Sequence, residues 1–117
     1  MLFKYNLFLS YASENKDIAD YIVDRIERRG YKCFIAPRDI RTGAEYAAEI
    51  IRGISNSTAV LLVFSSKSDK SHYVLREINS AVSLNRPIIP LRIEDFLPSE
   101  AMEFYLGPTH WLGAFPG

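Results

Sequence analysis

The sequence predicts an α/β protein with a parallel β-sheet that is covered by helices on both faces. Short apolar segments and amphipathic segments alternate four times along the chain, which is typical of a parallel sheet joined by right-handed crossovers. Residues 58–64, "TAVLLVF", are apolar almost throughout, as a strand that is buried on both faces must be. The length of 117 residues is sufficient for one such domain with a single hydrophobic core.

The first half of the chain supplies two strands and two helices. Residues 6–11 form a short apolar run that ends in small polar residues, which is typical of a buried strand. A helix is expected between an N-cap at Ser13 and a stop at Gly30, and its buried face comprises Ile18, Ala19, Ile22, Val23 and Ile26. Residues 31–36 form the second strand. Thr42 and Glu45 match a capping box for the next helix, which buries Ala47, Ile50, Ile51 and Ile54.

The second half continues the alternation. After the strand at 58–64, a helix is expected over residues 71–84, and its apolar face comprises Val74, Leu75, Ile78, Ala81 and Val82. Residues 86–93 resemble a fourth strand. Pro90 has no N–H to donate, so it belongs at a strand end or near an edge of the sheet. Residues 99–106 suggest a short helix and residues 109–112 a short fifth strand.

The composition excludes several classes of function. The chain has 14 basic and 14 acidic residues, so it offers no electrostatic argument for binding nucleic acid or an anionic membrane. No apolar run is long enough to span a bilayer, and the N-terminus does not match a signal peptide. Cys33 is the only cysteine, which favours a reducing, cytoplasmic setting.

Known motifs exclude further chemistry. The six glycines form neither of the two standard phosphate-binding patterns. His72 and His110 have no cysteine or acidic partner at metal-ligand spacing, so no metal site is predicted. Cys33 lies within a predicted strand, where a buried structural thiol is favoured over a nucleophile.

Glu77 is the unusual residue of the 71–84 helix. It lies at the edge of the apolar face, with Tyr73 one turn earlier on the same side. The positions three and four residues away hold Tyr73, Val74, Ser80 and Ala81, so no neighbour on the helix compensates its charge. In parallel sheets ligands gather at the carboxyl ends of the strands. Glu77 is expected about 9 Å from that edge, at ~1.5 Å per helical residue, where it could line a cleft.

The chain resembles a Toll/interleukin-1 receptor (TIR) domain of the bacterial type. The resemblance rests on the order and spacing of five segments along nearly the whole chain: "FLSYAS", "CFIAPRDIRTGAEY", "SKSDKSHYVLREI", "PIIPLRI" and "HWL". It implies a flavodoxin-like three-layer sandwich with five parallel strands in the order 2-1-3-4-5. Residues 1–117 are expected to form one TIR domain. The family usually has a final helix after the fifth strand, which this sequence lacks, so the chain is expected to be part of a longer protein or a shortened variant.

The resemblance implies an NAD+-consuming enzyme. Many TIR domains of bacterial, plant and axonal origin release nicotinamide from NAD+ and leave ADP-ribose or a cyclic isomer. The family's catalytic glutamate corresponds to Glu77, and the aromatic residue four positions earlier, often tryptophan, is Tyr73 here. NAD+ is a substrate in this reaction and no cofactor is implied. Bacterial relatives act in antiviral immune signalling in the cytoplasm and are activated by self-association with other TIR domains.

The resemblance and the loop positions suggest the remaining site residues. Arg38 is the basic candidate for the pyrophosphate, and Ser10, Tyr11 and Tyr46 are candidates for further lining of the substrate site. The long loop is expected to pack against a neighbouring copy, through Pro37, Arg38, Asp39, Ile40, Arg41, Thr42 and Gly43.

Each assignment has a structural alternative. Glu77 could pair with a distant basic residue, Tyr73 could serve in helix packing, and Arg38 with Asp39 could be a solvated loop pair. At the level of function, the alternative is a noncatalytic adaptor that recruits other TIR domains. A third function is the transfer of a ribose or deoxyribose between bases, with Glu77 as the nucleophile.

Overall fold

The computed structural model of the protein describes residues 3–109 and 111–113. The five strands are β1 (Tyr5–Ser10), β2 (Cys33–Phe34), β3 (Ser57–Phe64), β4 (Ile88–Arg92) and β5 (Leu112–Gly113). The α-helices are α1 (Lys16–Arg28), α2 (Tyr46–Ser55), α3 (Ser66–Asp69), α4 (His72–Ser83) and α5 (Glu100–Leu106), and a 3-10 turn, η1, covers Ser13–Asn15. The strands form one sheet in the order β2-β1-β3-β4-β5, and every pairing is parallel. The predicted flavodoxin-like topology is therefore confirmed.

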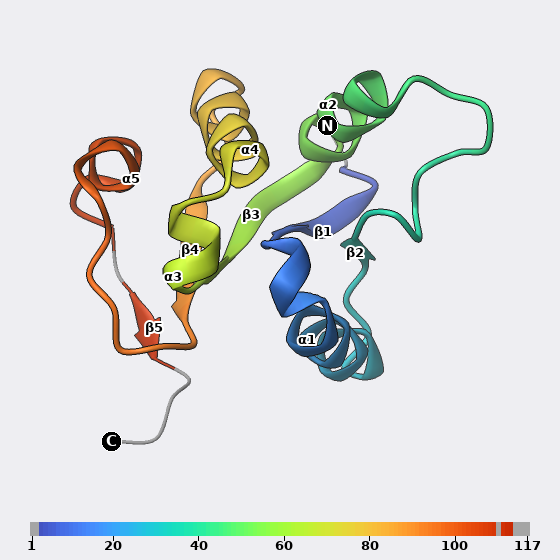
Figure 1. Ribbon diagram of the computed structural model, residues 1–117. Helices are drawn as coiled ribbons and strands as arrows, with labels where there is room; N and C mark the ends of the chain where they lie inside the picture. Colours follow the sequence, from blue (N-terminus) through green and yellow to red (C-terminus); the bar gives the residue numbers. More distant parts are fainter. Residues whose placement is uncertain (1–2, 110, 114–117) are drawn as a thin grey trace.

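The helices divide between the two faces of the sheet (Figure 1). Helices α2, α4 and α5 pack through a shared core with Phe8, Leu62 and Phe64 of the sheet, whereas α1 packs with Leu9, Leu61 and Val63 on the opposite face. Successive side chains of a strand point to opposite faces. Ser10 follows Phe8 by two positions, so it faces the same layer of helices as Phe8.

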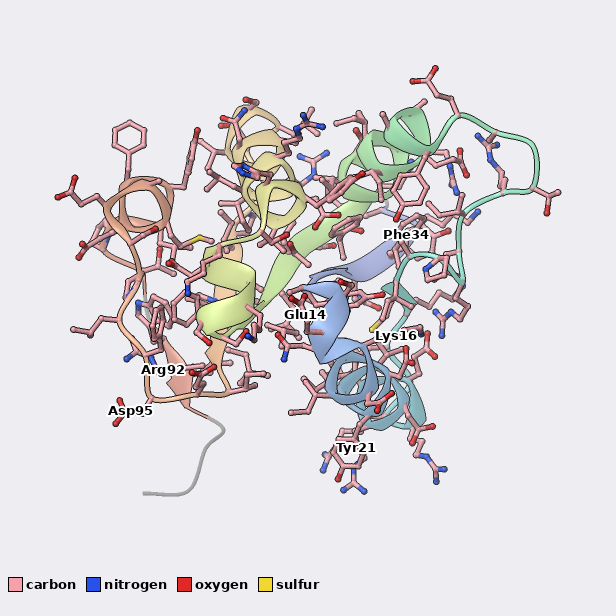
Figure 2. The ribbon with its side chains drawn as sticks, viewed as in Figure 1. Glu14, Lys16, Tyr21, Phe34, Arg92 and Asp95 are labelled. Atoms are coloured by element: carbon pink, nitrogen blue, oxygen red, sulfur yellow. The ribbon has the colours of Figure 1, made fainter. Side chains whose placement is uncertain are left out.

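Close packing fixes α2 against the sheet. A Cβ atom on Gly53 would lie 2.7 Å from the ring of Phe34, which only glycine avoids at this position. Phe34 stacks on Phe8 with ring centroids 5.4 Å apart. Figure 2 shows Phe34 inside the packed layer, whereas Tyr21 lies on the outer side of α1.

Two predicted helix starts are wrong. Ser13 does not cap α1, because it begins the turn η1 and its hydroxyl donates to Glu14. The Thr42–Glu45 capping box is absent too, since α2 begins at Tyr46 with Glu45 as an N-cap that makes no side-chain bond. Gly43 has a positive φ of 81°, and the N–H of Arg41 is held by Glu49. The chain therefore turns before the helix starts.

The other predicted helices and strands are present, although their first and last residues differ from the predicted ones. Ser71 caps α4 by accepting from the N–H of Val74, as expected for the 71–84 helix. The second strand is shorter than predicted, and Ile18, Ile51 and Val82 are exposed. Pro90 pairs with Leu62 of β3 and lies outside the short β4–β5 pairing. Its missing N–H therefore costs no hydrogen bond to β5.

The end of the chain is described in part. The predicted short helix is α5, and the predicted fifth strand is β5, although His110 lies outside the described residues. The expectation that no helix follows the fifth strand falls on residues 114–117, which are also outside them. Within the described residues, none of the helices has the length and apolar character needed to cross a bilayer.

Candidate active site

Glu77 is joined to the end of β1. The Oγ atom of Ser10 donates a hydrogen bond of 2.7 Å to Oε1 of Glu77. Ser10 is the last residue of β1 and is completely buried, while Glu77 is half-buried next to Ile78, which anchors α4 on the sheet. The two residues are 67 positions apart in the sequence. The fold therefore places the carboxyl at the carboxyl end of a central strand.

The surroundings of Glu77 favour its neutral form. Burial raises the pKa of Glu77 from 4.5 to about 8, and the hydrogen bond from Ser10 opposes this shift. The salt bridges among the described residues do not include Glu77. A cation bound beside this carboxyl would favour the carboxylate and lower its pKa. The site is thus suited to a positively charged ligand.

Glu77 lies in the wall of two adjoining hollows. The larger, which we call the main cleft, has a volume of about 360 Å³ and is lined by Leu9, Tyr11, Ser13, Ala36, Tyr46, Ser71, Tyr73 and Glu77. The smaller, which we call the α2–α4 pocket, has a volume of about 170 Å³ and is lined by Tyr46, Ala47, Ile50, Ile51, Tyr73, Arg76, Glu77 and Ser80. Tyr46, Tyr73 and Glu77 line both.

Three tyrosines surround the carboxyl. Tyr73 is 70% exposed and Tyr46 is 50% exposed, so neither ring serves mainly in core packing. Burial and the nearby Glu77 and Tyr73 raise the pKa of Tyr46. The hydroxyl of Tyr11 donates to the carbonyl oxygen of Ala36, which ties the floor of the main cleft to the start of the long loop. Four of the predicted site residues, Tyr11, Tyr46, Tyr73 and Glu77, thus line one cleft, and Ser10 supports it from behind.

Arg38 is placed elsewhere. Its guanidinium donates two hydrogen bonds of 2.9 Å to the carboxylate of Glu27 on α1. It also bonds to Asp39 and to the carbonyl oxygen of Cys33. Arg38 is not among the residues that line the main cleft. The structure therefore gives Arg38 and Asp39 a local ion pair, extended to Glu27, and does not bring Arg38 together with Glu77.

The long loop is held by a buried carboxylate that the sequence analysis missed. Glu49 of α2 is 1% exposed and accepts hydrogen bonds from the N–H and the guanidinium of Arg41 and from the guanidinium of Arg52. The bonds from Arg41, followed by those from Arg52, lower the pKa of Glu49 to about 2. Only the i,i+3 spacing of Glu49 and Arg52 was visible in the sequence.

Cys33 and the histidines add no site among the described residues. Burial raises the pKa of the Cys33 thiol to about 11, so it remains a protonated, buried thiol, as the sequence suggested. Within residues 3–109 and 111–113 there is no cluster of histidine, cysteine, aspartate and glutamate side chains that could hold a metal ion.

The fold and the site together define a flavodoxin-like α/β domain with a carboxyl-bearing cleft at the carboxyl edge of its sheet. The chain belongs to the TIR domain family, whose model matches residues 7–115.

Comparison with known proteins gives relatives of several origins. The chain is 26% identical over 101 residues to a protein of Brachypodium distachyon named probable 2′ cyclic ADP-D-ribose synthase, and the match covers 85% of this chain and 45% of that protein. The chain therefore spans about half the length of this curated relative.

Solved structures agree in fold. The TIR domain of the Toll-related receptor TRR-2 from Hydra magnipapillata is 24% identical, with a TM-score of 0.81 over 94% of this chain and 84% of that chain. A TIR-STING receptor from C. gigas, in complex with 2′,3′-cGAMP, is 25% identical, with a TM-score of 0.80 over 97% of this chain and 36% of that chain.

Proposed function

We propose that this TIR domain cleaves the bond between nicotinamide and ribose in NAD+, with Glu77 as the catalytic residue. The observation that carries the proposal is a single partly shielded carboxyl, held by Ser10, in the wall of a cleft with two exposed tyrosine rings. The name of the Brachypodium relative, a cyclic ADP-ribose synthase, supports this class of reaction.

The chemistry needs only one carboxylate. When the N–C1′ bond breaks, its electron pair leaves with the nicotinamide nitrogen, so the departing base is neutral and requires no general acid. This differs from an ordinary glycosidase, which uses a second carboxyl to protonate a leaving oxygen. The ribose becomes oxocarbenium-like, and the Glu77 carboxylate stabilises this positive charge. Water, or an atom of the same molecule, then bonds to C1′ and gives ADP-ribose or a cyclic isomer.

Other residues of the site bind the substrate in this proposal. The rings of Tyr46 and Tyr73 offer faces to a cationic pyridinium, a contact of about 0.5–2 kcal/mol. The Ser71 hydroxyl accepts from the N–H of Val74, which leaves its proton for a ligand oxygen. Arg38 does not bind the pyrophosphate in this proposal, because Glu27 and Asp39 occupy its guanidinium.

Self-association activates the reaction in this proposal. Pro37, Arg38, Arg41, Thr42 and Gly43 of the long loop are exposed, while the bonds between Arg41 and Glu49 fix the loop's middle on α2. An exposed loop with an anchored backbone is suited to contact a second TIR domain. The same surface also suits the alternative function, a noncatalytic adaptor that only recruits other TIR domains.

The test is nicotinamide release from NAD+ by protein clustered on a scaffold. Glu77→Gln is expected to lower turnover at least about 100-fold, because a preorganised charge of this kind contributes roughly 3 kcal/mol or more to the barrier. Glu103→Gln, which removes an exposed carboxylate from α5, is the matched control and keeps wild-type turnover. Equal turnover by the wild type and Glu77→Gln would reject the role of Glu77. Clustered protein that releases no nicotinamide would favour the alternative function, the noncatalytic adaptor.

A further inference from the structure

Charge is unevenly distributed along the chain, although its total is balanced. After Arg92 the sequence has acidic residues but no lysine or arginine. The acidic residues are Glu94, Asp95, Glu100 and Glu103. All of them are exposed, and they take part in none of the salt bridges among the described residues. Residues 94–104, between β4 and the approach to β5, therefore form an acidic surface, which we call the acidic edge.

Two apolar side chains are exposed within the acidic edge. Leu97 is 77% exposed and Phe104 is 80% exposed, and the ring of Phe104 packs edge-on against Tyr105 with centroids 5.4 Å apart. Aromatic side chains are enriched in protein–protein interfaces, and opposite charges across an interface steer the two partners together. The acidic edge therefore suits a partner that offers both positive charge and apolar surface.

The opposite edge of the sheet is basic. Residues 25–32, which comprise the end of α1 and the residues that lead into β2, contain four basic residues and one acidic residue. The acidic residue, Glu27, is already paired with Arg38. Three of the basic residues are exposed and belong to no salt bridge in the part of the chain that the structure describes: Arg25, Arg29 and Lys32.

Exposed tyrosines accompany these basic residues. Tyr21 is 61% exposed and Tyr31 is 55% exposed. The guanidinium of Arg25 lies over the ring of Tyr21, 5.8 Å from its centroid. Residues 21–32, which we call the basic edge, thus offer both positive charge and apolar surface, the two properties that the acidic edge requires of a partner.

The two edges lie at opposite ends of the molecule. β2 and β5 are the outermost strands of the sheet. The basic edge leads into β2, and the acidic edge precedes β5. Figure 1 shows α1 and α5 well apart, and Figure 2 shows the same for Tyr21 and Asp95. The two surfaces therefore do not neutralise each other within one molecule.

We propose that the acidic edge of one copy of this chain binds the basic edge of a second copy. A basic peptide would match only the acidic edge and a nucleic acid only the basic edge, whereas a second copy matches both. The contact joins different surfaces of the two copies, so each pair keeps one free edge of each kind and the contact can repeat. It uses neither the long loop nor Glu77, and it is therefore separate from the contact of the proposed function.

The first test uses the unaltered protein and follows its mass by analytical ultracentrifugation. The monomer has a mass of 13.4 kDa. Raising the salt from about 10 mM to about 1 M shortens the range of charge interactions from about 30 Å to about 3 Å. The mean mass is expected to rise with protein concentration at low salt and to return to that of the monomer at high salt. A protein that stays monomeric at low salt overturns the inference.

The second test reverses the charge of each edge. One variant carries Glu100→Lys with Glu103→Lys, and the other carries Arg25→Glu with Arg29→Glu. Each variant has two edges of the same sign, so its self-association at low salt is expected to be at least tenfold weaker than that of the wild type. An equimolar mixture is expected to associate again, because each edge of one variant then meets an opposite charge on the other.

The matched control separates the place of a charge from its amount. Glu14→Lys with Asp17→Lys changes the net charge as much as the acidic-edge variant does, at two exposed positions near the start of α1 and outside both edges. This control is expected to associate like the wild type. Thermal unfolding followed by circular dichroism verifies that each variant is folded, and the salt test needs no variant at all.

The outcomes separate this contact from the proposed reaction. Association of both charge-reversed variants at the strength of the wild type overturns the inference, and so does a mixture of the two that stays monomeric. Assembly of the wild type only after polylysine or RNA is added assigns an edge to an external partner and overturns it as well. Nicotinamide release by protein clustered on a scaffold depends on Glu77 and not on these edges, so either proposal can fail while the other stands.

Discussion

Glu49 on α2 and Glu77 on α4 belong to neighbouring helices on the same face of the sheet, and their environments are opposite. Two guanidinium groups and a backbone N–H surround Glu49, and the pKa of Glu49 falls to about 2. One serine hydroxyl contacts Glu77, and burial raises the pKa of Glu77 to about 8.

The carboxyl of Glu49 has matched charges and holds the loop on α2, whereas the unmatched carboxyl of Glu77 is the one to which we assign the proposed reaction. The carboxylate of Glu49 already has hydrogen-bond and charge partners on the long loop and on α2, so a bound cation would stabilise it little further. Glu77 lacks a comparable partner among the described residues, so in the proposed function the cationic substrate supplies the missing charge. Five experiments test this contrast.

The largest effect on stability is expected at Glu49. Glu49→Gln removes the charge that pairs with Arg41 and Arg52 and detaches the long loop, so the melting temperature at pH 7 is expected to fall by several degrees. Glu45→Gln is the matched control, because Glu45 makes no capping bond with its side chain. An unchanged melting temperature for Glu49→Gln would show that the ion pairs do not stabilise the fold.

The pH dependence of the same variant has a definite sign. The pKa of Glu49 is lowered in the folded protein, so its contribution to stability is present above 4.5 and is lost as the pH falls from 4.5 to about 2. Denaturant unfolding over this range is expected to show a steeper acid loss in the wild type than in Glu49→Gln.

Glu77 is expected to show the reverse behaviour. Its pKa is raised in the folded protein, so the stability that it contributes is complete below 4.5 and is lost as the pH rises to about 8. At pH 9, Glu77→Gln is therefore expected to be more stable than the wild type by at least about 1 kcal/mol, or at least ~4 °C in melting temperature. A variant that is less stable than the wild type at pH 9 would contradict the assigned environment.

Ser10 is expected to act as a positioning residue that lowers the pKa of Glu77 through its hydrogen bond. On the proposed function, kcat/KM for NAD+ rises with pH as Glu77 ionises. Ser10→Ala removes the bond that favours the carboxylate, so the midpoint of this profile is expected to move up by about one pH unit. Ser10→Thr restores the hydroxyl. Ser57→Ala is the matched control, since Ser57 is a buried serine that donates to Gly53 instead. A profile unmoved in Ser10→Ala would assign Ser10 to packing alone.

The smallest effect is expected at Tyr73. Tyr73→Trp enlarges the aromatic face beside Glu77, and tryptophan is the best side chain for contact with a cation. Because Tyr73 is 70% exposed, the change costs little stability, and the KM for NAD+ is expected to fall about two- to fivefold. A KM that is unchanged or higher would show that the ring does not meet the pyridinium.

Much of the fold was predictable because it depends on local patterns. The apolar run at 58–64 lies in β3, and the predicted amphipathic helix after it is α4, which begins at His72 with Ser71 as its N-cap. The errors lie where tertiary contacts decide. The start of α2 is set by the turn at Gly43 and by the bond from Arg41 to Glu49, which outweigh a local capping pattern.

The candidate site was predictable in part for the same reason. Glu77 was visible as a helical carboxylate without a local counter-charge, and Tyr73 was visible one turn away. Arg38 was assigned from its loop position, but Glu27, 11 residues away, pairs with it on the other side of the sheet.

Local patterns were sufficient to predict the alternation of strands and helices, the apolar central strand and the isolation of Glu77 on its helix, because these depend on residues within a few positions of one another. Three features depend on contacts between distant parts of the chain: Ser10 meets Glu77 across 67 residues, Arg41 and Arg52 neutralise Glu49, and two hollows share one carboxyl. Those contacts depend on the rotation of each helix over the sheet, which the packing of the whole core fixes.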